Sequence, residues 1–522
     1  MLEETKMTVI NVTMDVLGAK SYRVEGGEGV LDSPLKTINS SRPSLQEIPV
    51  IKQRRKVLEQ CEISPPPHSN PPTSLIPLTF LDLPWLFFSQ SQPLFFYDFP
   101  FPISHFTNST LPNLKHSLSL TLQHYFTFAA NLVVSSSDDD EEDRDKPHIV
   151  CAEEEDSVSL VVAESTGDFD QFCSDGARDA NWFHPLVPRL ASKSSGEIPL
   201  LAIQITVFPS AGISIGLAYH NVLADERTFN NFIKTWAAYC SSGSSSSLES
   251  LPIYDRGVIV DENGLEEIFL REWRERKVSQ EEVVIGIDDK KVETSGDMVR
   301  ATFLVDPTAM EKIRGFIIAT CEKQNQPLPV HLSPYVLACA FLWVCLLKTH
   351  QIITNESQYH ASPDRACFGF IAGGITRMPF PVPTNYLGNC VGFGRAIAER
   401  EELLGEDGIV VAARALGSTI KKLDKEVLSG VEKWVSDWDE INGSDLHVVV
   451  TWSPKLDLYE TDFGWGEPRK IEEISIDRSK AISVIESRDV GGGMEMGLAL
   501  PKTKMDAFTM FFTNGLNLMA LS

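Results

Sequence analysis

Residues 212–240 read GISIGLAYHNVLADERTFNNFIKTWAAYC, and three patterns follow one another along this stretch. Apolar residues alternate with small or polar ones from Gly212 to Tyr219, which predicts a β-strand with an aliphatic face in a core. From Thr228 onward apolar residues recur at helical spacing, with Asp225 or Thr228 as the N-cap. The eight residues between strand and helix include a histidine, an asparagine and an aspartate. The stretch therefore predicts a polar turn held at the edge of a sheet.

The rest of the chain also alternates between strand and helix patterns. Strands are predicted at 57–63 and 93–98 and, as a hairpin, over 199–219, with a helix over 111–128. In the second half, helices are predicted at 265–278, 308–324, 333–349, 409–434 and 502–518. Strands alternate with them at 299–305, 369–376, 446–451, 481–487 and 494–500. Helices interleaved with strands in both halves predict an α/β fold.

Composition narrows the class of protein and of partner. The 522 residues include 46 Lys and Arg against 72 Asp and Glu, a net charge of −26. Such an acidic chain is a poor partner for nucleic acid or for an anionic membrane surface. The sequence contains no uninterrupted run of about 18 apolar residues, so no membrane span is predicted. The amino terminus also lacks the pattern of a secretory signal. Nine cysteines without a Cys-x-x-Cys pair predict reduced thiols and no metal site, so we expect a cytoplasmic protein.

Composition also suggests where the chain divides. A serine-rich run at 241–247 is the best linker candidate. We predict an atypical N-terminal extension at 1–55, a first domain at 56–240, a crossover linker at 241–264 and a second domain at 265–522. The extension is expected to be a regulatory segment or the product of a wrongly assigned start, and its composition favours the second.

Four short motifs occur in a fixed order. Residues 77–85 read PLTFLDLPW, 385–390 read NYLGNC, 462–466 read DFGWG and 502–508 read KTKMDAF. In this order and separation they resemble the plant BAHD acyltransferases. The third is that family's second signature without change. The second resembles the Tyr-Phe-Gly-Asn-Cys motif of its anthocyanin and phenolic-glucoside branch, with Leu387 in place of Phe. The resemblance runs from about Lys56 to the carboxyl end.

The resemblance implies both a fold and an activity. The implied fold has two chloramphenicol-acetyltransferase-like α/β domains with mixed sheets, joined by a crossover loop, with an active-site channel between them. The implied activity transfers an acyl group from malonyl-CoA or hydroxycinnamoyl-CoA, as co-substrate, to a phenolic or flavonoid glycoside, with no bound cofactor or metal. A histidine four residues before the motif aspartate takes the acceptor's proton, and the freed oxygen attacks the thioester directly. We expect a monomer, because such a fold encloses its own site.

The resemblance also assigns roles to single residues. Asp225 corresponds to the structural aspartate, and Arg300 is its candidate partner. Thr451 corresponds to a residue that helps to hold the thioester oxygen, and Trp452 beside it is expected either to fill core or to narrow the pocket. Residues 462–466 are implied to be structural and remote from the reacting atoms. The channel and motif residues are Arg300, Tyr386, Asn389, Trp452, Ser453, Asp462, Phe463, Gly464, Trp465 and Gly466.

The sequence departs from the family at its base. Four residues before Asp225 stands Asn221, whose amide cannot take a proton. His220 stands one place too early. Neighbouring residues at a strand end project in opposite directions, so His220 is expected to pack or hydrogen-bond, and its rescue of the base would need a one-residue shift. Glu226 occupies the place of a family glycine, where a positive φ would strain it.

Three functions therefore remain open. The first is acyl transfer, weakened by Asn221 or restricted to an acceptor that ionises easily, such as an acidic phenol or a thiol. The second is an elimination, isomerisation or ring closure in the same pocket that does not need this base. The third is a non-catalytic protein that retains the pocket for a ligand. All three share the structural motifs, so only the altered turn separates them.

Overall fold

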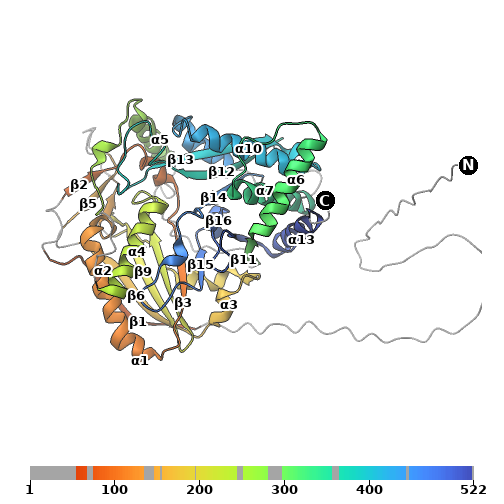
Figure 1. The fold of residues 1–522 in the computed structure, drawn as a ribbon. Coiled ribbons are helices and arrows are strands. Elements are labelled where there is room, and N and C mark those ends of the chain that lie inside the picture. The colour runs from red at the N-terminus through yellow and green to blue at the C-terminus, as the bar shows by residue number, and fades with distance from the viewer. Residues whose placement is uncertain are drawn as a thin grey trace, which may run out of the picture. The chain divides into compact units, whose positions relative to one another are not determined.

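A computed structural model describes residues 54–67, 74–134, 146–152, 156–193, 196–243, 251–279, 297–354, 364–442 and 446–519. All of these residues belong to one compact unit, Lys52–Ser522 (Figure 1). Nearly all of the predicted extension at 1–55 and part of the predicted linker at 241–264 lie outside the described residues. The domain boundaries predicted from composition therefore stay a prediction.

Two large mixed sheets and one small sheet organise the described part of the chain. The six-stranded sheet has the order β1 (Arg55–Ile63), β6 (Val158–Ser165), β9 (Leu201–Phe208), β10 (Gly212–Tyr219), β3 (Pro93–Asp98), β15 (Lys470–Glu473). The seven-stranded sheet has the order β13 (Val391–Glu399), β12 (Arg365–Gly373), β14 (Val448–Thr451), β16 (Ile482–Glu486), β17 (Met494–Pro501), β11 (Met298–Val305), β7 (Arg178–Asp179). The small sheet has the order β2 (Ser74–Pro77), β5 (His148–Cys151), β4 (Asn131–Val133), β8 (Ile198–Pro199).

The two large sheets exchange edge strands between the halves of the chain. β15 comes late in the sequence but pairs antiparallel with β3 of the six-stranded sheet. β7 comes early in the sequence but pairs antiparallel with β11 of the seven-stranded sheet. Each half thus supplies one strand to the sheet of the other, which is why residues 52–522 form one compact unit.

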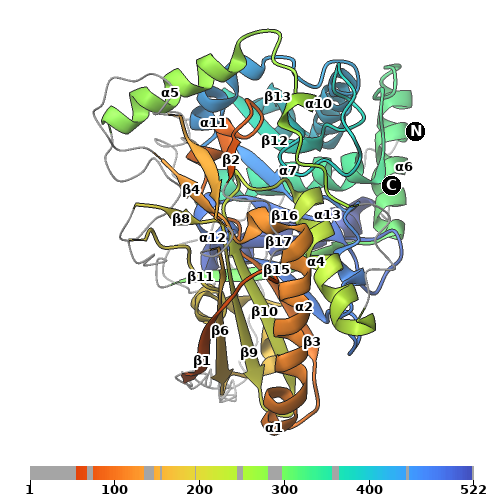
Figure 2. The ribbon, with the colours of Figure 1, turned by 90° about the vertical axis from the view of Figure 1, so that its left-hand side faces the viewer.

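Helices cover both large sheets. Figures 1 and 2 show α2 and α4 side by side across the six-stranded sheet, and α6, α7, α10 and α13 gathered around the seven-stranded one. The helices are α1 (Ile103–His105), α2 (Leu111–His124), α3 (Phe169–Cys173), α4 (Glu226–Ser242), α5 (Leu265–Ser279), α6 (Pro307–Lys323), α7 (Pro334–Ile353), α9 (Arg400–Leu404), α10 (Gly408–Leu423), α11 (Trp434–Asn442), α12 (Ile476–Ser479) and α13 (Lys502–Met519). Single turns of 3-10 or π-helix lie at Leu83–Phe87, Phe106–Thr110, Phe126–Phe128, Ala180–Trp182, His184–Leu186, Arg256–Val258, Val431–Lys433 and Leu458–Glu460.

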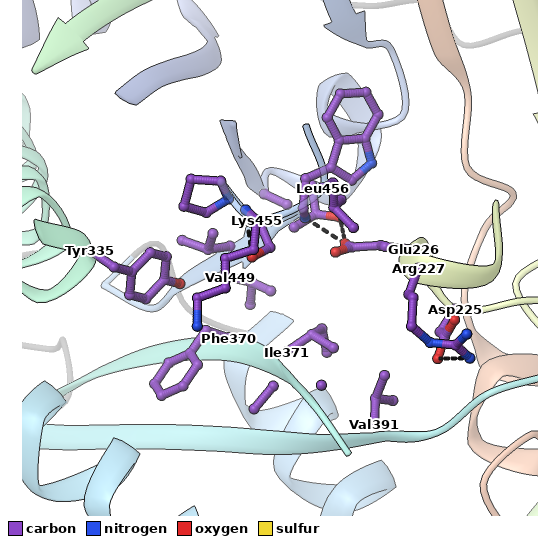
Figure 3. Close-up of a pocket in the computed structure, with 18 of the residues that line it drawn as sticks. Asp225, Glu226, Arg227, Tyr335, Phe370, Ile371, Val391, Val449, Lys455 and Leu456 are labelled. Carbon is purple, nitrogen blue, oxygen red and sulfur yellow. Dashed lines mark hydrogen bonds and ion pairs between the residues drawn. The ribbon is translucent and has the colours of Figure 1, made fainter. Parts of the chain in front are cut away.

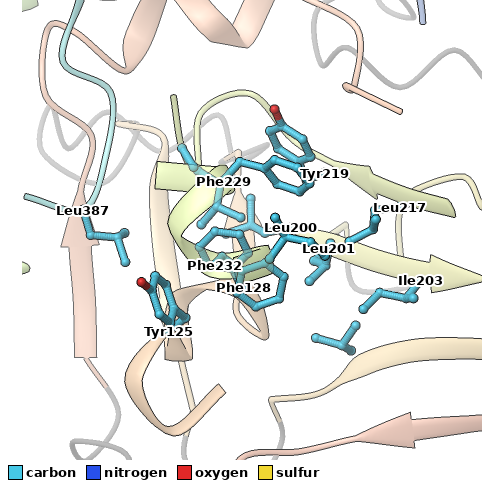
Figure 4. Packing of buried hydrophobic residues seen from close by; sticks show 14 of the residues in the cluster. Tyr125, Phe128, Leu200, Leu201, Ile203, Leu217, Tyr219, Phe229, Phe232 and Leu387 are labelled. Carbon is cyan, nitrogen blue, oxygen red and sulfur yellow. The ribbon is translucent and has the colours of Figure 1, made fainter. Parts of the chain in front are cut away.

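Strand β10 is buried on both faces and carries the turn that precedes α4. The aliphatic residues of its one face belong to the main core, as the alternation predicts. Tyr219, at its end, stacks on Phe229 of α4 with ring centroids 4.6 Å apart. Phe232, one turn further along α4, stacks on Phe128 at 4.2 Å (Figure 4). The first pair holds the start of α4 against the end of β10, and the second holds α4 against the 3-10 turn at Phe126–Phe128, so the turn before α4 has little freedom.

Most of the predicted elements are confirmed. The hairpin of β9 and β10, the helix after it, and the alternating helices and strands of the second half occur with ends shifted by a few residues. The helix predicted over 409–434 is wrong, because α10 ends at Leu423 and the chain passes through Gly430, whose φ is 76°, before α11 begins. The strand predicted over 369–376 begins earlier and ends at Gly373, because the Gly374 N–H turns to the Cys390 carbonyl.

One helix, α7, is long and apolar enough to cross a membrane by length and composition, which the search for uninterrupted apolar runs does not predict. About two thirds of its apolar window is buried inside the fold. It packs against α6, α10 and α13, so in this structure it is a core helix.

We expect Gly216→Ala to destabilise the fold by about 1–3 kcal/mol, a typical cost of overpacking. Gly216 lies in β10, and a Cβ there would come 2.4 Å from the backbone carbonyl oxygen of Leu186, which cannot simply rotate away. Gly315→Ala is the matched control, because Gly315 is exposed in α6 with no atom within 4 Å of a Cβ. The control should be neutral or stabilising, since alanine favours helix. Denaturant midpoints followed by circular dichroism compare the two, and equal midpoints would contradict the close packing of β10.

Candidate active site

A cavity of about 1010 Å³ opens beside the turn between β10 and α4. One wall is that turn, and the opposite walls are the end of β12 and the segment from β14 into residues 452–457 (Figure 3). Aromatic side chains contribute much of the surface, namely Trp85, Phe88, Tyr219, Tyr335, Phe370, Trp438 and Trp452. A cavity of this size is large enough for a drug-sized ligand with room to spare, so it is the candidate active site.

Asn221 lies in the cavity wall and both ends of its amide are engaged. Its Oδ1 accepts a hydrogen bond from the Ser91 hydroxyl at 2.7 Å. Its Nδ2 donates to the Ser89 carbonyl at 2.6 Å. The side chain is thereby tied to the segment before β3. An amide held in this way can orient a neighbour but has no proton-accepting pKa near neutrality.

His220 is buried behind the turn in this structure. It is 1% exposed and is not among the residues that line the cavity, which Asn221 next to it does line. Its Nδ1 accepts the backbone N–H of Val222 at 3.3 Å, within the same turn. The two neighbours thus project to opposite sides, and His220 has the packing and hydrogen-bonding environment expected of it.

Asp225 shapes the turn. Its Oδ1 accepts the N–H of Thr228 at 2.8 Å and caps α4, and its Oδ2 accepts the N–H of Cys390 at 3.2 Å. The nearest cation is Arg227, whose Nη2 lies 3.7 Å from Oδ2. The structural role of Asp225 agrees with the resemblance.

The predicted pairing of Asp225 with Arg300 is wrong. The Arg300 guanidinium is buried elsewhere, where it pairs with Asp477 and, at 3.1 Å, with Glu472. It also donates to the Glu473 carbonyl at 2.6 Å. The sequence gives no signal that favours Arg227 over Arg300 as the partner of Asp225. Arg300 is far from Asp225 along the chain and Arg227 is close to it, but neither position by itself shows which arginine makes the contact.

Asn389 joins the turn to the second half of the chain. Its Nδ2 donates to the carbonyls of Asn221 and Val222 at 3.0 and 3.2 Å. The same nitrogen, together with the Asn389 backbone N–H, reaches Oδ1 of Asp82 at 3.0 and 3.1 Å. Asp82 is fully buried, and sequence reasoning noticed it only as part of a framing segment.

Tyr386 belongs to the same arrangement. It is 1% exposed, and its hydroxyl accepts a hydrogen bond from Nη1 of Arg256 at 2.8 Å. That nitrogen also lies 3.6 Å from Oδ2 of Asp82. The motif at 385–390 therefore supports the turn from behind, and of its residues Asn389 and Cys390 line the cavity.

Glu226 is the residue that sequence reasoning misjudged. It is the first residue of α4 and does not have a positive φ, so the expected strain is absent from it. Its carboxylate lines the cavity and accepts, at Oε1, the N–H of Trp452 at 2.5 Å and the hydroxyl of Thr451 at 3.2 Å. Burial raises the pKa of the Glu226 carboxyl to about 7, although both hydrogen bonds favour the charged form.

Trp452, which contacts Glu226 from the opposite wall of the cavity, has the positive φ that was expected at Glu226. Trp452 has a φ of 65°, and its backbone N–H points to Glu226. Its indole is 7% exposed and belongs to the main core while also lining the cavity, so it both fills core and narrows the pocket. Thr451 and Ser453 line the cavity as predicted, but the Thr451 hydroxyl is directed to Glu226 in this structure.

The segment 462–466 lies outside the cavity lining. Oδ1 of Asp462 accepts the N–H groups of Gly464 and Gly466 at 2.7 and 2.9 Å, which closes a tight turn. Both glycines have φ above 100°, which a side chain would strain. Phe463 packs edge-on against the buried Trp236 at 5.0 Å and stacks on Trp465 at 5.6 Å. These contacts give the segment the structural role that the resemblance implies.

We expect Asn389→Ala to destabilise the site by more than the loss of side-chain volume alone would. The carbonyls of Asn221 and Val222 would lose their Asn389 donor, and Asp82 would keep the backbone N–H but lose the side-chain one. Leaving buried acceptors unsatisfied costs about 1–3 kcal/mol. Asn385→Ala is the control, since Asn385 is a nearby asparagine outside the cavity lining that bonds to one carbonyl, that of Leu251. Ligand binding and thermal unfolding would compare them, and equal effects would contradict the joining role of Asn389.

Comparison with known proteins identifies solved structures with a similar fold and relatives with a similar sequence. In structure, the protein is similar to vinorine synthase, with a TM-score of 0.62 at 18% identity over 87% of this chain and 96% of that one. This likeness confirms the predicted class, an α/β fold of chloramphenicol-acetyltransferase-like domains with mixed sheets.

Curated relatives cover nearly the whole chain. A malonyl-coenzyme A:anthocyanin 3-O-glucoside-6''-O-malonyltransferase of Dahlia pinnata is 34% identical over 88% of this chain and 97% of its own length. A coumaroyl-CoA:anthocyanidin 3-O-glucoside-6''-O-coumaroyltransferase of Arabidopsis thaliana is 34% identical over 90% and 99%. The model of the transferase family matches residues 62–514. The chain therefore belongs to this transferase family, the BAHD acyltransferases whose motifs it carries.

Proposed function

We propose that this protein transfers a malonyl or hydroxycinnamoyl group from acyl-CoA to a hydroxyl group of a phenolic or flavonoid glycoside. The proposal draws on the relatives, whose names give malonyl-CoA or coumaroyl-CoA as donor and anthocyanin or phenolic glucosides as acceptor. The observation that carries it is the cavity beside the turn at 220–225, whose supporting bonds from Asp82, Asp225 and Asn389 are intact. The large aromatic lining suits a flat phenolic acceptor, which stacks on such rings.

We also propose that the protein is a cytoplasmic monomer. All nine cysteines are free thiols in the structure, and most are buried, which suits a reducing compartment. Opposite walls of the cavity come from both halves of the chain, which suits a fold that encloses its own site.

The altered turn keeps two rival functions open. With an amide at position 221, a CoA-independent reaction or simple ligand binding would use the same cavity. The chemistry therefore has to be tested directly rather than inferred from the family alone.

We expect purified protein to form acylated glycoside only when acyl-CoA is present, with release of free CoA. Mass spectrometry on a panel of malonyl-CoA and coumaroyl-CoA against phenolic and anthocyanidin glucosides would detect the product. An Asn221→His variant assayed beside it separates a competent pocket from an inert one. Turnover of a glycoside without acyl-CoA would favour the second function. Binding without turnover in either protein would overturn the proposal in favour of a binding protein.

The charge of the cavity bears on the choice of donor. Lys455 lines the cavity and is exposed, and no carboxylate of the described residues lies within 4 Å of its ammonium group (Figure 3). The two lining arginines are already paired, Arg227 with Asp225 and Arg377 with Asp424. Lys455 is therefore the cation most available to an anionic acyl group such as malonyl.

We expect Lys455→Met to raise KM for malonyl-CoA roughly tenfold, because a charge-assisted hydrogen bond contributes about 1.5 kcal/mol or more. KM for coumaroyl-CoA should change much less, since that acyl group is uncharged. Lys234→Met serves as control, because Lys234 lies on α4 outside the cavity and pairs with Glu460. Steady-state kinetics with both donors decide the matter, and an equal rise for both would assign the lysine to CoA rather than to the acyl group.

A further inference from the structure

We propose that Glu226 is the proton acceptor of this site, in the place of the histidine that Asn221 replaces. This inference rests on the proposed function, because it concerns the same acyl transfer. The starting point is that acyl transfer to a hydroxyl needs a group that accepts its proton. A neutral hydroxyl needs help to lose its proton as it attacks a thioester, and general-base help contributes roughly 10²–10⁴ in rate. Neither Asn221, which is an amide, nor His220, which lies outside the cavity lining, supplies that help.

Glu226 is well placed to do so. It lies five residues after Asn221, at the first position of α4, and lines the same cavity. Figure 3 shows its side chain directed into the cavity toward the segment of Lys455 and Leu456, whereas Asp225 and Arg227 lie paired at the edge. Its backbone is fixed by the turn, because the Asp225 side chain caps α4 at the N–H of Thr228 and Glu226 is the first residue of that helix.

The contacts of Glu226 leave one oxygen for a substrate. Both of its donors, the Trp452 N–H and the Thr451 hydroxyl, reach Oε1. Oε2 makes no hydrogen bond to the described residues and lies on a side chain that lines the cavity, so it can meet an acceptor hydroxyl. The two donors hold the carboxylate in one orientation and stabilise its negative charge, which fixes the base before the substrate arrives.

The surroundings suit a group that both takes and returns a proton. Charged or titratable groups that act on Glu226 are Asp225 from its own turn, Glu473 from β15, Tyr219 from β10 and Tyr335 from α7. Lys455 and Glu486 also line the cavity. Burial among mostly neutral or acidic neighbours raises the pKa of Glu226 to about 7, near that of an ordinary histidine. A carboxyl with such a pKa exchanges protons efficiently at neutral pH.

In the proposed step, Glu226 takes a proton from the acceptor and later returns it to CoA. The Glu226 carboxylate takes the proton of the acceptor hydroxyl while that oxygen forms a bond to the thioester carbonyl carbon of acyl-CoA. The tetrahedral intermediate then collapses, the carbon–sulfur bond breaks with its electron pair going to sulfur, and the ester remains. The protonated Glu226 returns its proton to the leaving CoA thiolate. The products are acylated glycoside and CoA thiol, and the carboxylate is restored.

Four proteins form a cycle that tests this role: the native chain, Glu226→Gln, Asn221→His, and the double variant. Glu226→Gln should lower kcat by about 10²–10⁴-fold with little change in KM for either substrate. In the double variant the new histidine should supply the lost base and restore kcat to within about tenfold of Asn221→His alone. That rescue separates a proton acceptor from a residue that only holds Trp452 and Thr451 in place, because a histidine at 221 would not repair their position.

Glu460→Gln is the matched control, since it makes the same Glu-to-Gln change outside the cavity lining. Glu460 is exposed and pairs with Lys234 on the surface, so the variant should keep kcat within about twofold. The native protein gives a second measurement that needs no variant. Its kcat/KM should fall as pH drops below about 7, because protonated Glu226 cannot take a proton, and the fall should follow a single ionisation.

The other outcomes are equally distinct. A Glu226→Gln variant that keeps native kcat, or a double variant that stays as slow as Glu226→Gln, would overturn the inference. A silent native protein beside an active Asn221→His variant would also overturn it, while leaving the proposed transferase pocket intact. Silence of the native protein and of both histidine variants, with ligands still bound, would overturn the proposed function itself.

Discussion

The buried bond between Asp82 and Asn389 fixes the geometry on which the site depends. Asp82 comes from the first framing segment and Asn389 from the second half of the chain, 307 residues later. The amide of Asn389 holds the carbonyls of the turn at 221–222, and the carboxylate of Asp82 holds the amide. A buried carboxylate is costly unless its hydrogen bonds are made, so the two halves must meet correctly for the fold to be stable at all. The cavity wall is thus a consequence of folding rather than an addition to it.

That constraint explains why the shape of the turn does not depend on the side chain at position 221. Its shape is set by backbone carbonyls, by the cap at Asp225 and by ring stacking of Tyr219 on Phe229, none of which uses the side chain at position 221. The Asn221 side chain is hydrogen-bonded to the Ser91 hydroxyl and the Ser89 carbonyl instead. The architecture is therefore independent of the base, and family membership shows the scaffold without showing which group moves the proton.

The sequence predicted the scaffold well because its signals are local or repeated. Alternation in β10 and helical spacing after Asp225 each report one physical requirement, and the structure meets both. Predictions failed where a contact joins distant segments. The partners of Arg300 come from residues 472–477, and the role of Asp82 depends on a residue 307 positions away, which no local pattern encodes. Glu226 was misjudged because the resemblance, with a family glycine at this place, suggested a strained positive φ there. The positive φ belongs instead to Trp452, its neighbour in space.

Asn221 and Glu226 are physically connected through the cavity that both of them line. With an amide at position 221 and His220 outside the lining, the turn presents no imidazole to the cavity. An exposed glutamate would not fill that gap, because its pKa near 4.5 makes it a weak base for a hydroxyl. A glutamate in an aromatic, partly closed wall is different, since desolvation penalises its charge and brings its proton affinity toward that of histidine. The burial that makes Glu226 look unfavourable as a packing choice is therefore the property that makes it chemically competent.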